Sequence, residues 1–343
     1  MINLHSDTQT KPTAEMRKFM AAAPVGDEQQ LLDPSVNLLC EKSAKLLGKE
    51  AAVFLPSGIM CNLVSVLTHC RMGDELIAAD NSHMVMMEAG GMALGQVSCQ
   101  TIDKMSGIFN VDDIKHCVAK RRMGKNSTIP KMLVVENTHN FGGGVAWTMD
   151  ELNPVTEYCQ RQNMKLHMDG ARLLNASIAT GTTPAQYAKQ FDSVWFDLSK
   201  GLGCPVGAVL AGSEEFIQQV WVWKTRLGGA MRQAGIIAAA GIYALDNHVD
   251  LLAQDHKNAK NLATALNNIE NVSVNLKNLH TNIIMINIRN SAKKATDICT
   301  ALKAKNVAMV ALNEHEIRAV THLDVSADEC EQAAAIFANV MNN

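Results

Sequence analysis

The 343-residue sequence has little net charge and few aromatic residues. It carries 31 Lys and Arg against 34 Asp and Glu, and Phe, Trp and Tyr together make up only 4% of the chain. A net charge of −3 gives the chain no excess of positive charge with which to bind nucleic acid or an acidic membrane surface. We therefore expect neither a nucleic-acid partner nor a membrane partner.

Several sequence patterns are also missing. No run of about 18 apolar residues occurs, and the segment from Met1 to Thr8 lacks a basic region followed by an apolar core. The nine cysteines include no Cys-x-x-Cys pair, and the eleven histidines give no His-Glu-x-x-His arrangement. We therefore expect a cytoplasmic protein without a metal site, in which cysteines such as Cys204 are packing residues.

The order of apolar segments predicts two domains. Short apolar runs alternate with helical patterns, which is typical of a mainly parallel sheet with helices on both faces. The expected strands are 51–55, 75–79, 131–136, 165–169, 193–198 and 207–211. After a helix at 238–250 the pattern indicates a two-layer α+β unit, with strands at 271–276, 282–288, 307–312 and 317–323 and helices at 292–305 and from 327. We therefore expect a large domain at 1–250 and a small one at 251–343.

Lys200 stands between an apolar strand and a glycine-rich turn, in the run from Asp197 to Gly207. Desolvation there disfavours the ammonium form, which makes the amine available as a nucleophile toward a carbonyl. Asp169 ends an earlier expected strand. A lysine and an aspartate so placed are the pair that pyridoxal phosphate needs, because the amine holds the cofactor aldehyde covalently and the carboxylate keeps the pyridinium nitrogen protonated. Taken singly, a common Ser-Lys-Gly turn and a helix-capping aspartate remain alternative interpretations.

The segment from Leu55 to Asn62 is interpreted as a turn that opens a helix. Ser57 and Gly58 leave backbone amides free at the positive end of that helix, which favours a dianionic phosphate. An ordinary N-cap role for Ser57 is compatible with this, since the same geometry caps a helix and binds an anion. Glu136, Asp169 and Lys200 all follow expected strands, where open α/β sheets place their ligands.

With these residues in place, the chain resembles the threonine aldolase/β-eliminating lyase family, whose members are aspartate aminotransferase-like (fold type I) pyridoxal-phosphate enzymes. The resemblance extends from residues 4–8 to 320–326. It implies an α/β fold, with a mainly parallel sheet of the seven-stranded type in the large domain and a small C-terminal α+β domain. It also implies pyridoxal 5′-phosphate as cofactor, and a lyase that cleaves L-threonine, L-allo-threonine or a related β-hydroxy-α-amino acid to glycine and an aldehyde. The motifs that carry it are the run 197–207, Asp169-Gly-Ala-Arg172, Glu88-Ala-Gly-Gly91, Glu136-Asn-Thr-His-Asn140 and Gly228-Gly-Ala-Met-Arg-Gln233.

The resemblance assigns the catalytic roles to three residues. Lys200 would bind the cofactor covalently, and Asp169 would pair with the pyridine nitrogen. His83 matches the histidine that stacks on the cofactor ring, from where it could take the proton of a substrate hydroxyl. Without the family, a capping or core histidine would be the preferred interpretation of His83.

Binding roles follow in the same way. The phosphate would contact Gly58 and the amide of Ile59, with Ser199 as a lesser candidate and Arg232 contributed by a second copy of the chain. This implies a homodimer or homotetramer with the active site at the interface. The carboxylate of a small amino-acid substrate would be held by the arm at residues 1–25, through Ser6, and by two arginines, whose guanidinium forks suit a carboxylate. These arginines are Arg172, which also lies among the expected cofactor contacts, and Arg318.

At several positions the chain departs from the family pattern. A tyrosine, a hydroxyl residue, aromatic residues, a histidine and a lysine are replaced. The residues that stand there are Gln30, Ile59, the segment Met84-Val85-Met86-Met87, Asn126 in the segment Lys125-Asn-Ser-Thr128, and Thr225. These changes leave open a β-elimination, or aldol cleavage of a bulkier β-substituted amino acid, on the same scaffold. A non-catalytic descendant is disfavoured by the joint presence of Lys200, Asp169, Arg172 and Arg318.

Overall fold

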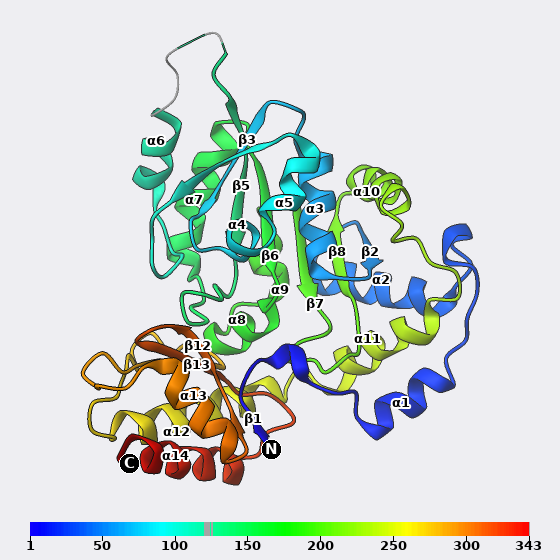
Figure 1. The fold of residues 1–343 in the computed structure, drawn as a ribbon. Coiled ribbons are helices and arrows are strands. Elements are labelled where there is room, and N and C mark those ends of the chain that lie inside the picture. Colours follow the sequence, from blue (N-terminus) through cyan, green and yellow to red (C-terminus); the bar gives the residue numbers. More distant parts are fainter. Residues whose placement is uncertain (120–123, 125, 343) are drawn as a thin grey trace.

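The computed structural model describes residues 1–119, 124 and 126–342 (Figure 1). A large unit contains a seven-stranded sheet, and a smaller unit at the C-terminal end of the chain contains a four-stranded one. Both termini lie beside the smaller unit in Figure 1.

The strands of the large sheet follow the order β2-β8-β7-β6-β5-β3-β4. Of the seven strands in this sheet, β8 alone runs opposite to the other six, so the predicted mainly parallel sheet is confirmed. The prediction missed β4, an edge strand in which Ser98, Gln100 and Thr101 interrupt the apolar pattern. The bounds are β2 (Ala51–Leu55), β3 (Asp74–Ala79), β4 (Ser98–Ile102), β5 (Ile129–Glu136), β6 (Lys165–Gly170), β7 (Ser193–Asp197) and β8 (Ala208–Gly212).

Helices cover both faces of this sheet, because successive strand residues point to opposite sides. Phe54 packs in the same apolar cluster as Leu39, whereas its neighbour Val53 packs with Val64 on the other face. The helices of the large unit are α1 (Ala14–Ala21), α2 (Pro34–Leu47), α3 (Gly58–His69), α4 (His83–Met87), α5 (Ala89–Met92), α6 (Val111–Ala119), α7 (Met149–Arg161), α8 (Leu173–Thr180), α9 (Pro184–Ala188), α10 (Glu214–Arg226) and α11 (Gly235–Asn247), with the short 3-10 helices η1 (Asp7–Gln9), η2 (Glu28–Gln30) and η3 (Ala93–Gly95).

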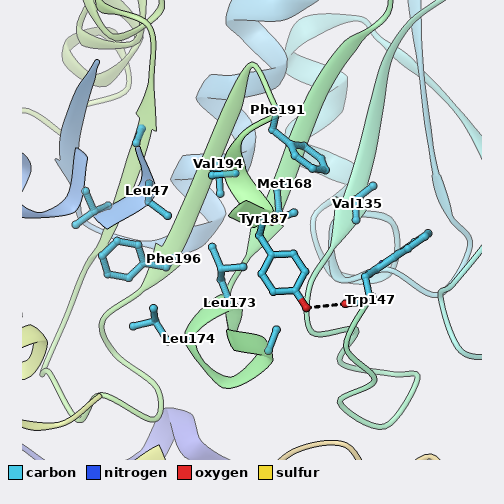
Figure 2. Close-up of a cluster of buried hydrophobic side chains, with 14 of the residues drawn as sticks. Leu47, Val135, Trp147, Met168, Leu173, Leu174, Tyr187, Phe191, Val194 and Phe196 are labelled. Carbon is cyan, nitrogen blue, oxygen red and sulfur yellow. Dashed lines mark hydrogen bonds between the residues drawn. The ribbon is translucent and has the colours of Figure 1, made fainter. Parts of the chain in front are cut away.

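The apolar core on one face of the sheet is dense and includes large aromatic side chains (Figure 2). Trp147 and Tyr187 are almost completely buried there. The Tyr187 hydroxyl donates a hydrogen bond of 2.6 Å to the Trp147 carbonyl, which satisfies its polar atom within the core. Such packing gives the strands that carry the site a rigid support.

The small sheet is antiparallel, with the order β12-β13-β10-β9. The predicted strand at 307–312 is in fact two strands, because Val307–Ala308 pairs with the N-terminus and Val310–Asn313 pairs with β13. The elements are α12 (Leu252–Asn267), β9 (Ser273–Val274), β10 (Ile283–Asn287), α13 (Ala295–Ala304), β11 (Val307–Ala308), β12 (Val310–Asn313), β13 (Glu316–Val320) and α14 (Ala327–Asn342).

The N-terminal arm joins the two units. Strand β1 (Ile2–Asn3) is parallel to β11, and Ile2 and Leu4 belong to the apolar core of the small unit. The arm then crosses to the large unit, where the Thr10 hydroxyl donates a hydrogen bond of 2.8 Å to the carbonyl of Lys200. The expected boundary between residues 250 and 251 falls between α11 and α12.

Within the described ranges, no single helix has the length and hydropathy needed to cross a membrane. Helices α11 and α12 meet that criterion only when taken together, and they are bent by 72° at their junction.

Candidate active site

The predicted chemistry lies at the C-terminal ends of neighbouring strands. Asp169 in β6 is in register with Glu136 of β5 on one side and with Trp195 of β7 on the other. Lys200 follows the end of β7 by three residues. The sheet therefore brings Lys200, Asp169 and the segment after Glu136 together at the C-terminal ends of its central strands.

Lys200 is fixed by its own turn. Its ammonium nitrogen lies 3.1 Å from Asp197 Oδ2, and 16% of its side chain is exposed. Asp197 Oδ1 accepts hydrogen bonds of 2.8 Å from both the backbone amide and the hydroxyl of Ser199. Gly207 has φ +104°, and a Cβ there would lie 2.3 Å from the Phe54 ring, so only glycine allows the chain to turn back this closely. The tight turn explains why a glycine-rich run follows the lysine.

Asp169 is a buried carboxyl group with few partners. Its Oδ1 accepts from the amide of Ala171 at 3.1 Å, and its Oδ2 accepts from Asn62 Nδ2 at 2.8 Å. Burial, with the nearby carboxylates of Glu136 and Glu88, raises the pKa of Asp169 to about 7, although Lys200 opposes this shift. A cation beside this carboxyl would relieve the unfavourable charge of its ionised form.

Asn62 links four groups around Asp169, and the sequence did not point to it. Its Nδ2 donates to Asp169 and, at 3.1 Å, to Glu88 Oε1. Its Oδ1 accepts from Trp195 Nε1 at 2.7 Å and contacts His167 Nε2 at 3.1 Å. The sequence signal that could have identified Asn62 is its spacing from the predicted phosphate site. It lies four residues after Gly58 and therefore on the same face of the helix.

His83 begins α4 and is held at two points. Its Nδ1 lies 2.6 Å from Glu88 Oε1, and its backbone amide donates to Glu136 Oε2, also at 2.6 Å. The hydrogen bond that His83 donates to the Glu88 carboxylate raises the pKa of His83, while burial opposes the shift and the negative charge of Asp169 supports it. Because Nδ1 is engaged with Glu88, Nε2 is the nitrogen left to exchange a proton with a substrate.

The start of α3 provides an anion site. Ser57 is the N-cap, and its hydroxyl accepts from the Met60 amide at 3.2 Å. The amides of Gly58 and Ile59 precede that bond and, as first-turn amides, have no intrahelical acceptor. A Cβ on Gly58 would lie 2.3 Å from the Trp195 ring, so this position requires glycine. Ile59 is 53% exposed and also lines a cavity beside Asn62 and Glu88.

Arg232 lies on the surface of the single chain. Its guanidinium is 3.0 Å from Asp27 Oδ2, and 63% of its side chain is exposed. The loop that carries it is anchored by Glu28, whose Oε2 accepts from the Met231 amide at 2.8 Å and whose Oε1 pairs with buried Lys224. A phosphate contact from Arg232 therefore depends on a second copy of the chain and stays a prediction.

Two arginines converge on Asn140 Oδ1, Arg172 from 3.4 Å and Arg318 from 3.2 Å. Arg172 also binds Asp7 at two points, 2.7 Å from Nε and 2.6 Å from Nη2. Burial opposes ionisation of Asp7, but Arg172 outweighs it and lowers the pKa of that carboxyl to about 2. Ser6 precedes Asp7, and its hydroxyl accepts from the Thr8 hydroxyl at 2.8 Å.

Arg318 is the less satisfied member of the arginine pair. Its Nε is buried and has no hydrogen-bond partner among the described residues. Burial and the nearby positive charge of Arg172 lower the pKa of Arg318. Asp7 pairs with Arg172, and no ion-pair partner of Arg318 is found among the described residues, so Arg318 is the guanidinium that a substrate carboxylate would pair with.

The substituted positions lie around this site rather than within its hydrogen-bond network. Gln30, Met86 and Met87 are exposed. Asn126 is exposed in a turn before the start of β5, whereas Asp169 lies near the C-terminal end of the adjacent strand β6. Lys125 lies outside the described residues.

The donor set fits pyridoxal 5′-phosphate. Lys200 offers an amine, buried Asp169 offers a carboxyl group without an ion pair among the described residues, and the start of α3 offers first-turn amides for a phosphate. A lysine and a buried aspartate at one edge of a mainly parallel seven-stranded sheet, with a small C-terminal unit, define a fold type I pyridoxal-phosphate enzyme. The sequence model of the beta-eliminating lyases matches residues 3–290, and the chain belongs to this family. It is a lyase with pyridoxal 5′-phosphate as cofactor, so the predicted fold class and cofactor are confirmed.

Similar proteins cover essentially the whole chain. The low specificity L-threonine aldolase of Escherichia coli (strain K12) is 40% identical over 337 residues, which cover 98% of each chain. The probable low-specificity L-threonine aldolase 2 of Arabidopsis thaliana is 38% identical and covers 100% of this chain and 98% of its own. Among solved structures, a threonine aldolase from Leishmania major has a TM-score of 0.86 at 19% identity and covers 99% of this chain and 100% of its own. A putative L-allo-threonine aldolase from Listeria monocytogenes EGD-E has a TM-score of 0.82 at 22% identity and covers 99% and 96%.

Proposed function

We propose that the chain cleaves L-threonine, L-allo-threonine or a related β-hydroxy-α-amino acid to glycine and an aldehyde. The observation that carries the proposal is that Glu88 holds His83 through Nδ1, with Asp169 and Lys200 near enough to act electrostatically on its ring. When bound, the cofactor supplies an electron sink for the electron pair left at Cα as the Cα–Cβ bond breaks. Similarity to proteins named as threonine aldolases supports the choice of substrate.

The chain's own residues orient the substrate and move one proton. Arg318 and the Nη1 group of Arg172 would bind the substrate carboxylate, and this contact would orient Cα and so decide which of its bonds breaks. His83 accepts the proton of the β-hydroxyl at Nε2, while Glu88 holds the ring through Nδ1. Removing that proton lets the hydroxyl carbon become the carbonyl carbon of the aldehyde.

One observation favours a bulkier β-substituent as a second candidate. A cavity of about 190 Å³ lies beside Asn62 and Glu88. Its apolar lining includes Ile59, Leu63, Met84, Met87 and Met92. Methionine side chains adapt to irregular shapes, so this cavity suits an apolar group larger than the methyl of threonine.

The assembly and location of the chain are part of the same proposal. We propose a homodimer or homotetramer in which Arg232 of one copy reaches the phosphate at Gly58 and Ile59 of another. Exposed apolar side chains near the loop that holds Asp27 support an interface there, namely Val25, Leu31, Leu32 and Leu38. We further propose a cytoplasmic location, which is supported by nine cysteines spaced without any Cys-x-x-Cys pair.

The purified protein tests this proposal directly. We expect a yellow protein, which absorbs visible light and releases glycine and acetaldehyde from threonine. We expect a Lys200→Ala variant to lack both the visible absorption band and the reaction. Asp169→Asn is expected to keep the fold and lose most of the turnover. A panel of β-hydroxy amino acids and β-substituted alanines distinguishes the second candidate. A wild-type protein that remains colourless with added pyridoxal phosphate would overturn the proposal.

A further inference from the structure

A row of hydrogen-bonded side chains connects Asp169, near the C-terminal end of β6, to the N-terminal end of the adjacent strand β7 and to His69 at the end of α3. Asn62 donates to Asp169 at 2.8 Å, and His167 Nε2 lies 3.1 Å from Asn62 Oδ1. The Ser193 hydroxyl lies 2.8 Å from His167 Nδ1 and 2.8 Å from His69 Nε2. His69 lines a cleft of about 430 Å³, whereas the four other members of the row are buried.

Regular secondary structure builds this row. His167 and Asp169 are two residues apart in β6 and share one face of the sheet. Ser193 is in register with His167 on the adjacent strand β7. Asn62 and His69 are seven residues apart in α3, so they lie two turns apart on one face of the helix. The row therefore runs between α3 and the strands beneath it.

Trp195 fixes the direction of the hydrogen bonds nearest to Asp169. An indole nitrogen can only donate, so the Asn62 oxygen must face Trp195 and the Asn62 amide nitrogen must face Asp169. His167 Nε2 then donates to the same Asn62 oxygen. Burial and the neighbouring His69 hold the pKa of His167 well below its usual range, so its ring is neutral and Nδ1 accepts.

The same logic extends to His69. Because His167 Nδ1 accepts, the single proton of Ser193 points toward His167, and the Ser193 oxygen accepts from His69 Nε2. Burial lowers the pKa of His69 to about 4, against the pull of Asp192, which is itself paired with Lys165 at 2.7 Å. Every donor in the row therefore points toward Asp169, and such aligned hydrogen bonds polarise one another.

We infer that Asn62, His167, Ser193 and His69 are positioning residues that hold Asp169 as an ionised hydrogen-bond acceptor for the pyridine nitrogen of the cofactor. The inference rests on the proposed function, because it takes Asp169 as the partner of that nitrogen. Burial and two neighbouring carboxylates favour the neutral acid at Asp169, and the aligned donors oppose them. His69, next to the N-terminal end of β7, thus contributes to cofactor binding at the opposite end of the strands.

Two substitutions of His69 separate hydrogen bonding from packing. His69 stacks on Phe216 with ring centroids 4.6 Å apart, and His69→Phe keeps a stacking ring but removes the donor. His69→Gln removes the ring but keeps an N–H donor at the end of the side chain. We expect His69→Phe to weaken the affinity of the apo-protein for pyridoxal phosphate by about three- to tenfold, and His69→Gln to stay within about twofold of wild type. Titration of the apo-protein with pyridoxal phosphate, followed by absorbance, measures both.

A serine pair gives a second, spectroscopic test. Ser193→Ala removes the donor to His167, whereas Ser65→Ala, the control, removes a buried hydroxyl that only bonds the carbonyl of Cys61 within α3 at 2.7 Å. Histidine ¹⁵N spectra of the full-length apo-protein should show a neutral His167 protonated at Nε2. In Ser193→Ala its Nδ1 signal should move to that of a nitrogen without a hydrogen bond, while Ser65→Ala should leave it unchanged.

The outcomes distinguish this inference from the proposed function. If folded His69→Phe and Ser193→Ala variants bind pyridoxal phosphate as tightly as wild type, the row does not act on Asp169 and the inference is overturned. A protonated His167, or one protonated at Nδ1, also overturns it. If the histidine spectra are as expected but the wild-type protein binds no pyridoxal phosphate, the proposed function has failed, and the role of the row at Asp169 fails with it.

Discussion

Asp7 and Arg172 form a two-point ion pair that ties the N-terminal arm to the end of β6, with contacts of 2.6 and 2.7 Å. Both side chains are almost completely buried. The pair holds the arm next to the arginine cluster while leaving Nη1 of Arg172 directed at Asn140. The arm is thus part of the site's structure.

Breaking this pair should destabilise the protein strongly. Asp7→Asn leaves the buried Arg172 without a counter-charge, and we expect a loss of about 3–5 kcal/mol in the free energy of unfolding. Urea denaturation monitored by circular dichroism measures it. Asp246→Asn, which removes the exposed partner of Lys42, is the control and should change stability by less than about 1 kcal/mol.

The same pair predicts a pH dependence of stability. The pKa of Asp7 falls from 3.8 to about 2 on folding, so its stabilising contribution is complete above the unfolded value. It should be lost as the pH falls from about 4 to about 2, and this loss should be absent in Asp7→Asn. Equal acid sensitivity of the two proteins would show that other groups control unfolding.

Glu88→Gln should shift the acid limb of the pH–rate profile. A base must be neutral to accept a proton, and Glu88 raises the pKa of His83 above 6.5, so we expect the wild-type kcat to fall as the pH drops through a value above 6.5. Removing the carboxylate should move this limb to lower pH. Glu157→Gln, at an exposed position, should leave the profile unchanged. An unshifted limb in Glu88→Gln would assign the titration to another group.

Arg318→Lys should weaken substrate binding more than cofactor binding. A lysine cannot reproduce the guanidinium fork, and we expect KM to rise by about ten- to a hundredfold, the range for a lost hydrogen bond to a charged group. The affinity for pyridoxal phosphate should change little. Arg289→Lys, at an exposed position, is the control. Equal weakening of substrate and cofactor binding would indicate a structural role for Arg318.

The sequence predicted those parts of the molecule that are local. Lys200 and Asp169 can be found in the sequence because each comes at or after the end of an apolar strand pattern. The same pattern predicts six strands of the large sheet. The contacts that set the charge and orientation of the site residues join parts of the chain that are far apart in the sequence. Asn62 meets Asp169 across 107 positions and Arg172 meets Asp7 across 165, and no spacing rule links them. Arg172 was expected to face the substrate carboxylate, but two of its donors are engaged by Asp7.

Pairing of β1 with β11 sets the order in which the molecule can be completed during synthesis. The residues of β1 leave the ribosome well before Val307 and Ala308, the two residues with which they pair. Until then the arm that carries Ser6, Asp7 and Thr10 has no strand to dock on, so the turn at Lys200 lacks its bond from Thr10. A nascent chain can therefore build its large sheet before β11 emerges, but it cannot dock the N-terminal arm against the site until Val307 and Ala308 have been synthesised.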